Sequence, residues 1–165
     1  MLGGEILATE PKPFQMAKSV YQACMNKELI EKRGLEPVKA IIEKLGGWPM
    51  LEGNKWTGEE GFKWYEQMYK HRELGFSVDY FYDFSVATDL KNSSWRTMDL
   101  DQPSLGMSRE YLMKGLEDSD IQAYFTYMKD VAMLMGASQE QAEQEMLEVI
   151  KFEIDVANIS LPRLE

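Results

Sequence analysis

Apolar residues recur every three or four positions in the N-terminal part of the chain, the spacing that places side chains on one face of an α-helix. The pattern predicts a first helix after Pro13 that turns Cys24 toward the protein interior. The apolar face of this helix consists of Phe14, Ala17, Val20, Tyr21, Cys24 and Met25. Pro37 suits the first position of a second helix, which the Gly46-Gly47 pair ends. The second apolar face consists of Val38, Ile41, Ile42 and Leu45.

Tryptophans in Trp48-Pro49 and at Trp56 flank a loop with turn-forming glycines. We expect both indoles to anchor this loop on the core, and an aromatic platform for a ligand is the alternative interpretation. Thr57-Gly58-Glu59-Glu60 then has the pattern of a capping box, whose hydroxyl and last carboxylate satisfy free backbone N–H groups. The box predicts a third helix that runs to about Glu73 and ends at Gly75. Its predicted inward residues are Phe62, Tyr65, Met68 and Tyr69.

From Phe76 onward, apolar and polar residues alternate, which is the period of an extended strand. This alternation predicts a strand from Tyr82 to Thr88. The polar segment Lys91-Asn92-Ser93-Ser94 supplies a turn, and Trp95 to Leu100 supplies the returning strand. Because a two-stranded hairpin is marginally stable alone, it must lie against helices or against another part of the protein.

Helical spacing returns after the hairpin. Ser108 is expected to cap a short helix that reaches Met113, and Ser119 to begin a longer helix that Gly136 closes. The longer helix should bury Ile121, Tyr124, Phe125, Met128, Val131, Ala132 and Met135. Ser138-Gln139-Glu140-Gln141 is a second capping box and opens the last helix. That helix should bury Ala142, Met146, Val149, Ile150 and Ala157.

Composition fits this mainly α fold: one helical domain, residues 1–165, with a small inserted β-hairpin. The 44% hydrophobic content suffices for a core. A net charge of −10 argues against nucleic acid as a partner and against anionic lipid. We expect no membrane segment, because no apolar run reaches the roughly 18 residues needed. The first five residues also lack the features of a signal peptide.

The side chains that could carry chemistry favour structural roles. His71 is the single histidine and stands next to Arg72, where a cation is favourable at the end of a helix. Asp99 and Asp101 share a strand face but lack the further ligands of a calcium loop, and Asp101 reads as a turn or cap. The sequence therefore predicts no catalytic, cofactor-binding or metal-ligating residue in this chain.

Several blocks of sequence occur together in a fixed order. They are Ala23-Cys24-Met25-Asn26, Leu45-Gly46-Gly47-Trp48-Pro49, Asp89-Leu90-Lys91-Asn92-Ser93, Asp101-Gln102-Pro103-Ser104-Leu105-Gly106-Met107, Ser108-Arg109-Glu110-Tyr111 and Phe152-Glu153-Ile154-Asp155-Val156-Ala157. Together they resemble the N-terminal region of the neprilysin and endothelin-converting-enzyme family of zinc metallopeptidases, nearly end to end from Phe14 to Leu161. Such enzymes hold zinc with His-Glu-x-x-His, which needs two histidines. The resemblance thus implies that zinc belongs to a catalytic lobe that this chain lacks.

The resemblance also implies how the chain is processed. In the family the cysteine at the position of Cys24 forms a disulfide with a partner far downstream, outside this chain; without the resemblance, Cys24 would be a small buried hydrophobe. Asn92-Ser93-Ser94 and Asn158-Ile159-Ser160 are candidate N-glycosylation sites. We therefore expect an extracellular or cell-surface protein of the secretory pathway.

Two functions are compatible with the sequence. The family implies a non-catalytic segment of a metalloendopeptidase cap region, which helps to enclose peptide substrates, selects them by size and supports the catalytic lobe. The alternative is a free-standing, catalytically dead module that binds peptides or proteins, such as a secreted decoy. A chain that lacks its catalytic lobe should expose apolar surface and self-associate, and the strongest candidates are Tyr80, Tyr82, Phe84 and Trp95.

Overall fold

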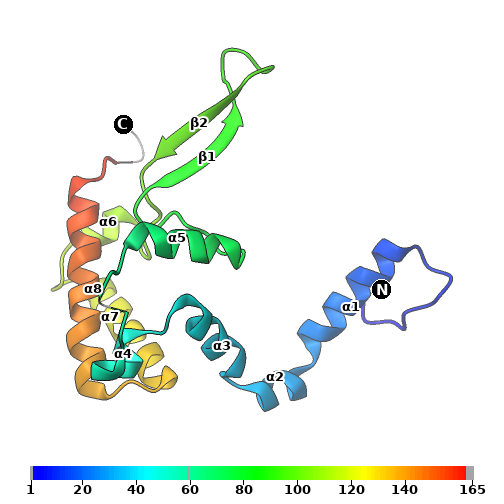
Figure 1. Cartoon of the computed structure of the whole chain (residues 1–165), viewed down its shortest axis with the longest axis horizontal. Helices are drawn as coiled ribbons and strands as arrows, with labels where there is room; N and C mark the ends of the chain where they lie inside the picture. Colours follow the sequence, from blue (N-terminus) through cyan, green and yellow to red (C-terminus); the bar gives the residue numbers. More distant parts are fainter. Residues whose placement is uncertain (1, 59, 163–165) are drawn as a thin grey trace. The chain divides into compact units, whose positions relative to one another are not determined.

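Helices dominate the computed structural model, which describes residues 2–58 and 60–162 except for the side chain of Asn54. The described residues form eight α-helices, one 3-10 helix and one antiparallel β-hairpin, so the predicted fold class is confirmed (Figure 1). The chain divides into two compact units, Met1–Ile41 and Ile42–Glu165, which we call unit 1 and unit 2. The single-domain assignment stays a prediction.

Unit 1 contains α1 (Lys12–Met25), α2 (Lys27–Arg33) and the first part of α3 (Glu36–Leu45). α1 matches the predicted first helix. α2 was not predicted, because its seven residues are too few to show a stripe. It is set by its ends: the Asn26 side chain accepts a hydrogen bond from Leu29 N at 3.0 Å, and Gly34 with φ of 50° stops it.

The predicted inward position of Cys24 is wrong. Among the described residues of unit 1 none is buried, and Cys24 is exposed. The same holds for the rest of the stripe, since Phe14 is 63% and Val20 64% exposed. The spacing gave the helix correctly, but no described element of unit 1 covers its apolar face.

Unit 2 begins with the end of α3, which the Gly46-Gly47 pair stops as predicted. The following loop contains two short elements that were not predicted, α4 (Pro49–Glu52) and the 3-10 helix η1 (Gly53–Lys55). Trp48 packs against a buried cluster, and Trp56 Nε1 donates a hydrogen bond to Gly46 O at 3.1 Å. Both indoles therefore anchor this segment.

Helix α5 (Trp64–Glu73) starts later than predicted. Gly58, Glu60 and Gly61 lie in turns and not in a helix, and Glu59 of the predicted box lies outside the described residues. Gly61 explains the difference, because its φ of 85° lies in the left-handed region and interrupts a helix. Of the four residues expected to face inward, only Met68 is buried.

The hairpin consists of β1 (Asp83–Thr88) and β2 (Arg96–Asp101), within one residue of the prediction. Its antiparallel register runs from the pair Asp83 and Asp101 to the pair Thr88 and Arg96. Asp89 shapes the turn, since its Oδ1 accepts hydrogen bonds from two backbone N–H groups at 2.8 and 2.7 Å.

Three helices complete unit 2, namely α6 (Arg109–Leu112), α7 (Ser119–Met135) and α8 (Gln139–Ile159). α7 begins at Ser119 as predicted, and its N-cap is Asp118, whose side chain accepts a hydrogen bond from Asp120 N. Ser138 caps α8 as predicted, because its Oγ accepts from Gln141 N at 3.2 Å. Ser108 occupies the N-cap of α6 without a side-chain hydrogen bond.

Helix α8 carries both buried clusters of unit 2 and lies beside α6 and α7 (Figure 1). One cluster consists of Met50, Ala132, Ala142 and Met146, and the other of Leu112, Ile121, Ile150 and Ala157. Val131 and Val149, which were expected to be buried, are exposed at the margins of these contacts. None of the described helices is long and apolar enough to cross a membrane.

Candidate functional site at the base of the hairpin

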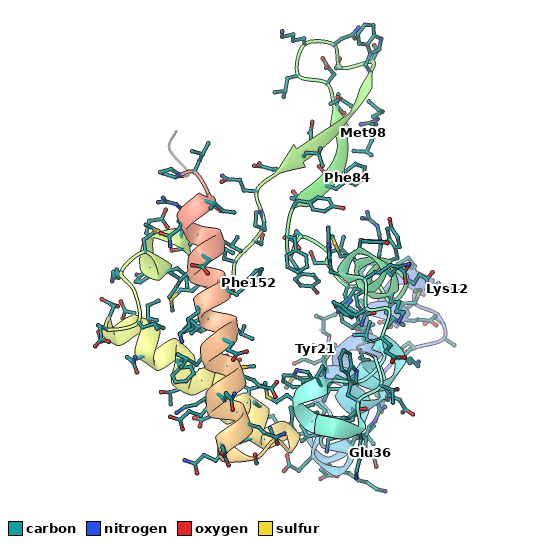
Figure 2. All side chains as sticks on the ribbon, turned by 60° about the vertical axis from the view of Figure 1, so that its left-hand side comes forward. Lys12, Tyr21, Glu36, Phe84, Met98 and Phe152 are labelled. Carbon is teal, nitrogen blue, oxygen red and sulfur yellow. The ribbon has the colours of Figure 1, made fainter. Side chains whose placement is uncertain are left out.

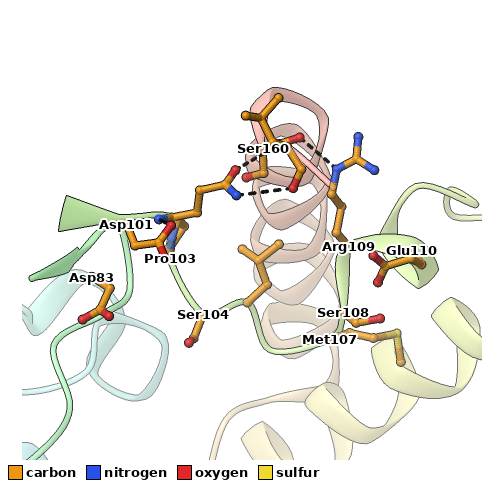
Figure 3. A pocket seen from close by; sticks show the side chains of 12 residues that line it. Asp83, Asp101, Pro103, Ser104, Met107, Ser108, Arg109, Glu110 and Ser160 are labelled. Carbon is orange, nitrogen blue, oxygen red and sulfur yellow. Dashed lines mark hydrogen bonds between the residues drawn. The ribbon is translucent and has the colours of Figure 1, made fainter. Parts of the chain in front are cut away.

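Sequence blocks that lie far apart along the chain meet where the hairpin joins the helices (Figure 3). The loop 102–108 leaves β2, passes the C-terminal end of α8 and enters α6. We call this region the junction. It brings the block that begins at Asp101 into contact with the block Phe152–Ala157.

Arg109 closes the C-terminal end of α8. Its Nε donates hydrogen bonds to Ala157 O at 3.1 Å and to Ser160 O at 2.9 Å, and Figure 3 shows the bond to Ser160. The last carbonyl groups of a helix have no partners within the helix and carry partial negative charge, so a guanidinium is favourable there. These bonds fix α6 to a segment 48 and 51 residues further along the chain.

Gln102 makes a second link, across 59 residues. Its Nε2 donates to Leu161 O at 3.3 Å, and its Oε1 accepts from Leu161 N at 2.5 Å (Figure 3). The side-chain amide thus pairs with both the N–H and the C=O of one residue. The end of β2 is thereby held to the chain that follows α8.

The two ends of the hairpin are also tied to each other. Ser104 N donates to Asp79 O at 3.0 Å, which joins the loop after β2 to the segment before β1. Hydrogen bonds from Ser77 and from Ser104 to the Asp79 carboxylate lower the pKa of Asp79. The base of the hairpin is therefore closed by polar contacts as well as by the strand ladder.

Gly106 occupies the tightest place of the junction. Its N–H donates to Glu153 Oε1 at 2.8 Å. A Cβ at this position would overlap the Tyr124 hydroxyl and lie 2.9 Å from the same carboxylate oxygen, so any larger residue requires these side chains to shift. Burial, together with the charge of Glu153 and a hydrogen bond to it, raises the pKa of Tyr124 to about 12.

Two cavities flank the junction. The larger, of about 500 Å³, has walls from both strands of the hairpin, the loop 102–108 and the end of α8, and it includes the facing carboxylates of Asp83 and Asp101 (Figure 3). The smaller, of about 340 Å³, is lined in part by Phe81 and Phe152, which contact each other edge to face with ring centroids 6.2 Å apart. Among the residues that the structure describes, no three His, Cys, Asp or Glu side chains converge to hold a metal ion.

The residues that the sequence marked for modification lie elsewhere. Cys24 is a free, exposed thiol at the end of α1 in unit 1. Asn92 is exposed in the hairpin turn, and Asn158 is exposed in the last turn of α8. The disulfide and both glycosylation sites stay predictions.

Sequence reasoning gave no role to Arg109, Gln102, Tyr124 or Glu153 in this junction. One signal was present. Glu153 follows Ile150 by three positions and precedes Ala157 by four, so it is a charged residue on the apolar stripe of its helix. Such a residue needs a polar partner, which here is the backbone of Gly106.

Comparison of the sequence with known proteins shows the family of this chain. The sequence profile of peptidase family M13 matches residues 4–165. Neprilysin-2 of Drosophila melanogaster is 49% identical over 154 residues, which are 93% of this chain and 20% of that protein. Neprilysin-21 of Caenorhabditis elegans is 36% identical over 161 residues, 97% of this chain and 21% of its own length. Endothelin-converting enzyme 1 of Homo sapiens is 30% identical over 150 residues, which are 89% of this chain and 19% of that protein.

The sequence thus matches the N-terminal region of neprilysin-like metallopeptidases. The chain belongs to peptidase family M13. It spans about a fifth of the length of the relatives that it matches.

The environment of Tyr124 predicts a loss of stability at high pH. A tyrosine whose pKa is raised from 10.0 to about 12 by folding stabilises the fold below pH 10, and this contribution is lost as pH rises from 10 toward 12. We expect a loss of about 1 kcal/mol, because solvent screens this partly buried group. Denaturant unfolding over this pH range should give a flatter curve for Tyr124→Phe than for the parent chain. Parallel curves would contradict the assignment.

The exposure of Cys24 predicts a reactive thiol in the folded state. A thiol reagent should modify about one group per chain without denaturant, and Cys24→Ser should abolish the reaction. Modification that appears only after unfolding would show that Cys24 is covered.

Proposed function

We propose that this chain is the non-catalytic N-terminal segment of a zinc metalloendopeptidase, in which it helps to enclose peptide substrates, selects them by size and supports the catalytic lobe. The observation that carries the proposal is apolar surface without cover. The stripe of α1 and one face of the hairpin are exposed among the described residues. Relatives about five times as long supply the mass that can cover such surfaces.

The chain's only histidine supports a non-catalytic role. His71 lies in the last turn of α5, and its Nδ1 is 2.8 Å from Gln67 O. One imidazole cannot supply the two histidines of a His-Glu-x-x-His zinc site. Zinc and the reacting water would therefore be held by the lobe outside this chain, and the chain's own contribution is to restrict access.

The junction supports the role in size selection. A surface that excludes large peptides from a cavity must be rigid. The link from Gly106 to Glu153 holds the loop after β2 to α8, and the link from Gln102 to Leu161 holds the end of β2 to the chain that follows α8. They join segments 59 and 47 residues apart, which makes the base resistant to local bending.

The family also supports an extracellular or cell-surface location for the parent protein. We propose that Cys24 pairs with a cysteine of the remaining polypeptide, and that Asn92 and Asn158 are candidate glycan acceptors. The exposure of all three side chains is compatible with these modifications.

The test compares the isolated chain with the full-length product of its gene on short and long peptides that share one cleavage sequence. The isolated chain should hydrolyse neither, whereas the full-length protein should cleave short peptides in a chelator-sensitive reaction. Gln102→Ala in the full-length protein should raise the kcat/KM ratio of long to short peptides severalfold. Gln144→Ala, at an exposed position of α8, is the matched control.

Three outcomes would contradict the proposal. Chelator-sensitive hydrolysis by the isolated chain would make it catalytic. An unchanged length preference in Gln102→Ala would remove the size-selecting role. A gene that ends near residue 165 would favour the free-standing binding module.

A further inference from the structure

The hairpin has two chemically different faces. Residues directly opposite in an antiparallel pair point to the same face, and successive residues alternate between faces. The register pairs Phe84 with Leu100 and Val86 with Met98. The opposite face carries the aspartates Asp83, Asp99 and Asp101. We call these the apolar face and the acidic face.

The apolar face of the hairpin is largely exposed to solvent, although the apolar face of a sheet is normally covered. On the apolar face Val86 is 62%, Met98 72% and Leu100 72% exposed. On the acidic face Asp83, Ala87 and Thr97 are half-buried, whereas Ser85, Asp99 and Asp101 are exposed. Figure 2 shows Phe84 near the hairpin base and Met98 further toward the tip. The apolar surface continues to the tip through the exposed Leu90 and Trp95.

None of the described helices of unit 2 covers the apolar face of the hairpin. The strands pair extensively only with each other, whereas α6, α7 and α8 pack together elsewhere. The residues that the sequence predicted to form one exposed aromatic surface do not all lie on the apolar face. Tyr80 contacts His71 and Tyr82 contacts Trp64 before the strand begins, so of Tyr80, Tyr82 and Phe84 only Phe84 belongs to the apolar face.

We propose that the apolar face of the hairpin is the docking surface for the remaining, catalytic part of the same polypeptide, an inference that rests on the function proposed above. The chain spans only about a fifth of its relatives' length, so a large covalently linked partner is at hand. A linked partner meets this face at high effective concentration, which favours it over a free one.

The charge distribution disfavours a second copy as the natural occupant. Each chain carries a net charge of −10, so face-to-face pairing brings two acidic molecules together. The apolar face has one cation at its distal end, Arg96, whose Nη1 donates to the Thr88 hydroxyl at 2.5 Å. The docked surface should therefore be apolar, with a hydrogen-bond acceptor or carboxylate opposite Arg96. Once the apolar face is covered, the acidic face is the one that stays in contact with water.

The test replaces one pair on each face with the same two residues. Val86→Lys with Met98→Glu changes the apolar face, and the new charges lie opposite each other, so the hairpin itself is preserved. Ser85→Lys with Asp99→Glu is the matched control on the acidic face. Both double variants are made in the isolated chain and in the full-length protein.

In the isolated chain, both double variants should keep the parent's circular dichroism and thermal midpoint. The parent and the acidic-face control should self-associate in light scattering over a concentration series, and the apolar-face variant should remain monomeric. In the full-length protein, the apolar-face variant should be cleaved by a protease about tenfold faster than the parent or the control, because the hairpin no longer docks.

Two results would overturn the inference. If the apolar-face variant unfolds the isolated chain, these residues are core of this chain and not a docking surface. If it leaves proteolysis of the full-length protein unchanged, another element carries the contact. The kcat/KM ratio of long to short peptides for the Gln102→Ala protein is measured independently of either result. Failure of the docking surface is therefore distinguishable from failure of the enclosing function.

Discussion

Gly106→Ala is expected to destabilise the folded chain by about 3 kcal/mol. The added methyl group meets the Tyr124 hydroxyl and the Glu153 carboxylate, and overpacking of this kind costs roughly 1 to 3 kcal/mol. Displacement of the backbone also weakens the 2.8 Å hydrogen bond from Gly106 N to the carboxylate, a charged acceptor worth about 1.5 to 3 kcal/mol. The two losses overlap, so they do not add in full. Denaturant unfolding measures the change.

A second substitution identifies the cause. Tyr124→Phe removes the oxygen atom that an alanine side chain would meet first, so it should recover part of the stability lost in Gly106→Ala. Gly3→Ala is the control, because a Cβ there has only an ordinary 3.6 Å contact with Tyr21, and it should change stability by less than about 0.5 kcal/mol. Equal losses for Gly106→Ala with and without the Tyr124 hydroxyl would show that the clash lies elsewhere.

Local patterns predicted most of the fold, because their causes are local. The three- and four-residue spacing located α1, α3, α7 and α8, and the alternation of period two located the hairpin to within a residue. Glycines ended α3 and α7 as expected, since Gly46 and Gly136 adopt positive φ. In each case the signal and the structure depend on the same few consecutive residues.

The errors arose where a local signal competed with another influence. The box at Thr57 has the right residue types for a helix start, yet Gly61 adopts a left-handed conformation and delays α5 to Trp64. The stripe that contains Cys24 is apolar on one face, but helical spacing does not say what covers that face. Periodicity predicts conformation better than it predicts burial.

The junction could not be predicted from spacing at all. Its contacts join Gln102 to Leu161 and Arg109 to Ala157, across 59 and 48 residues. Only the tertiary arrangement of the hairpin against α8 brings these groups together. Three of the six blocks that carry the family resemblance meet in the junction, since Gly106 and Arg109 of two of them contact the block Phe152–Ala157.

Ile150→Ala is expected to cost about 3 kcal/mol, the second large effect. Ile150 is fully buried in the cluster with Leu112 and Ile121, and removal of a buried branched side chain leaves a cavity as well as a loss of transfer energy, roughly 2 to 5 kcal/mol in total. Leu105 and Met107 of the junction loop pack against the same cluster, so the loss should loosen the hairpin base as well as α8. The neighbouring Val149→Ala is the matched control, because Val149 is 41% exposed, and it should cost less than about 1 kcal/mol. Thermal and denaturant unfolding give the two free energies, and hydrogen exchange at Gly106 N–H should quicken in Ile150→Ala but not in Val149→Ala. Equal destabilisation by the two substitutions would mean that α8 presents a different face to α6 and α7. The contacts of the junction with α8 would then be wrong.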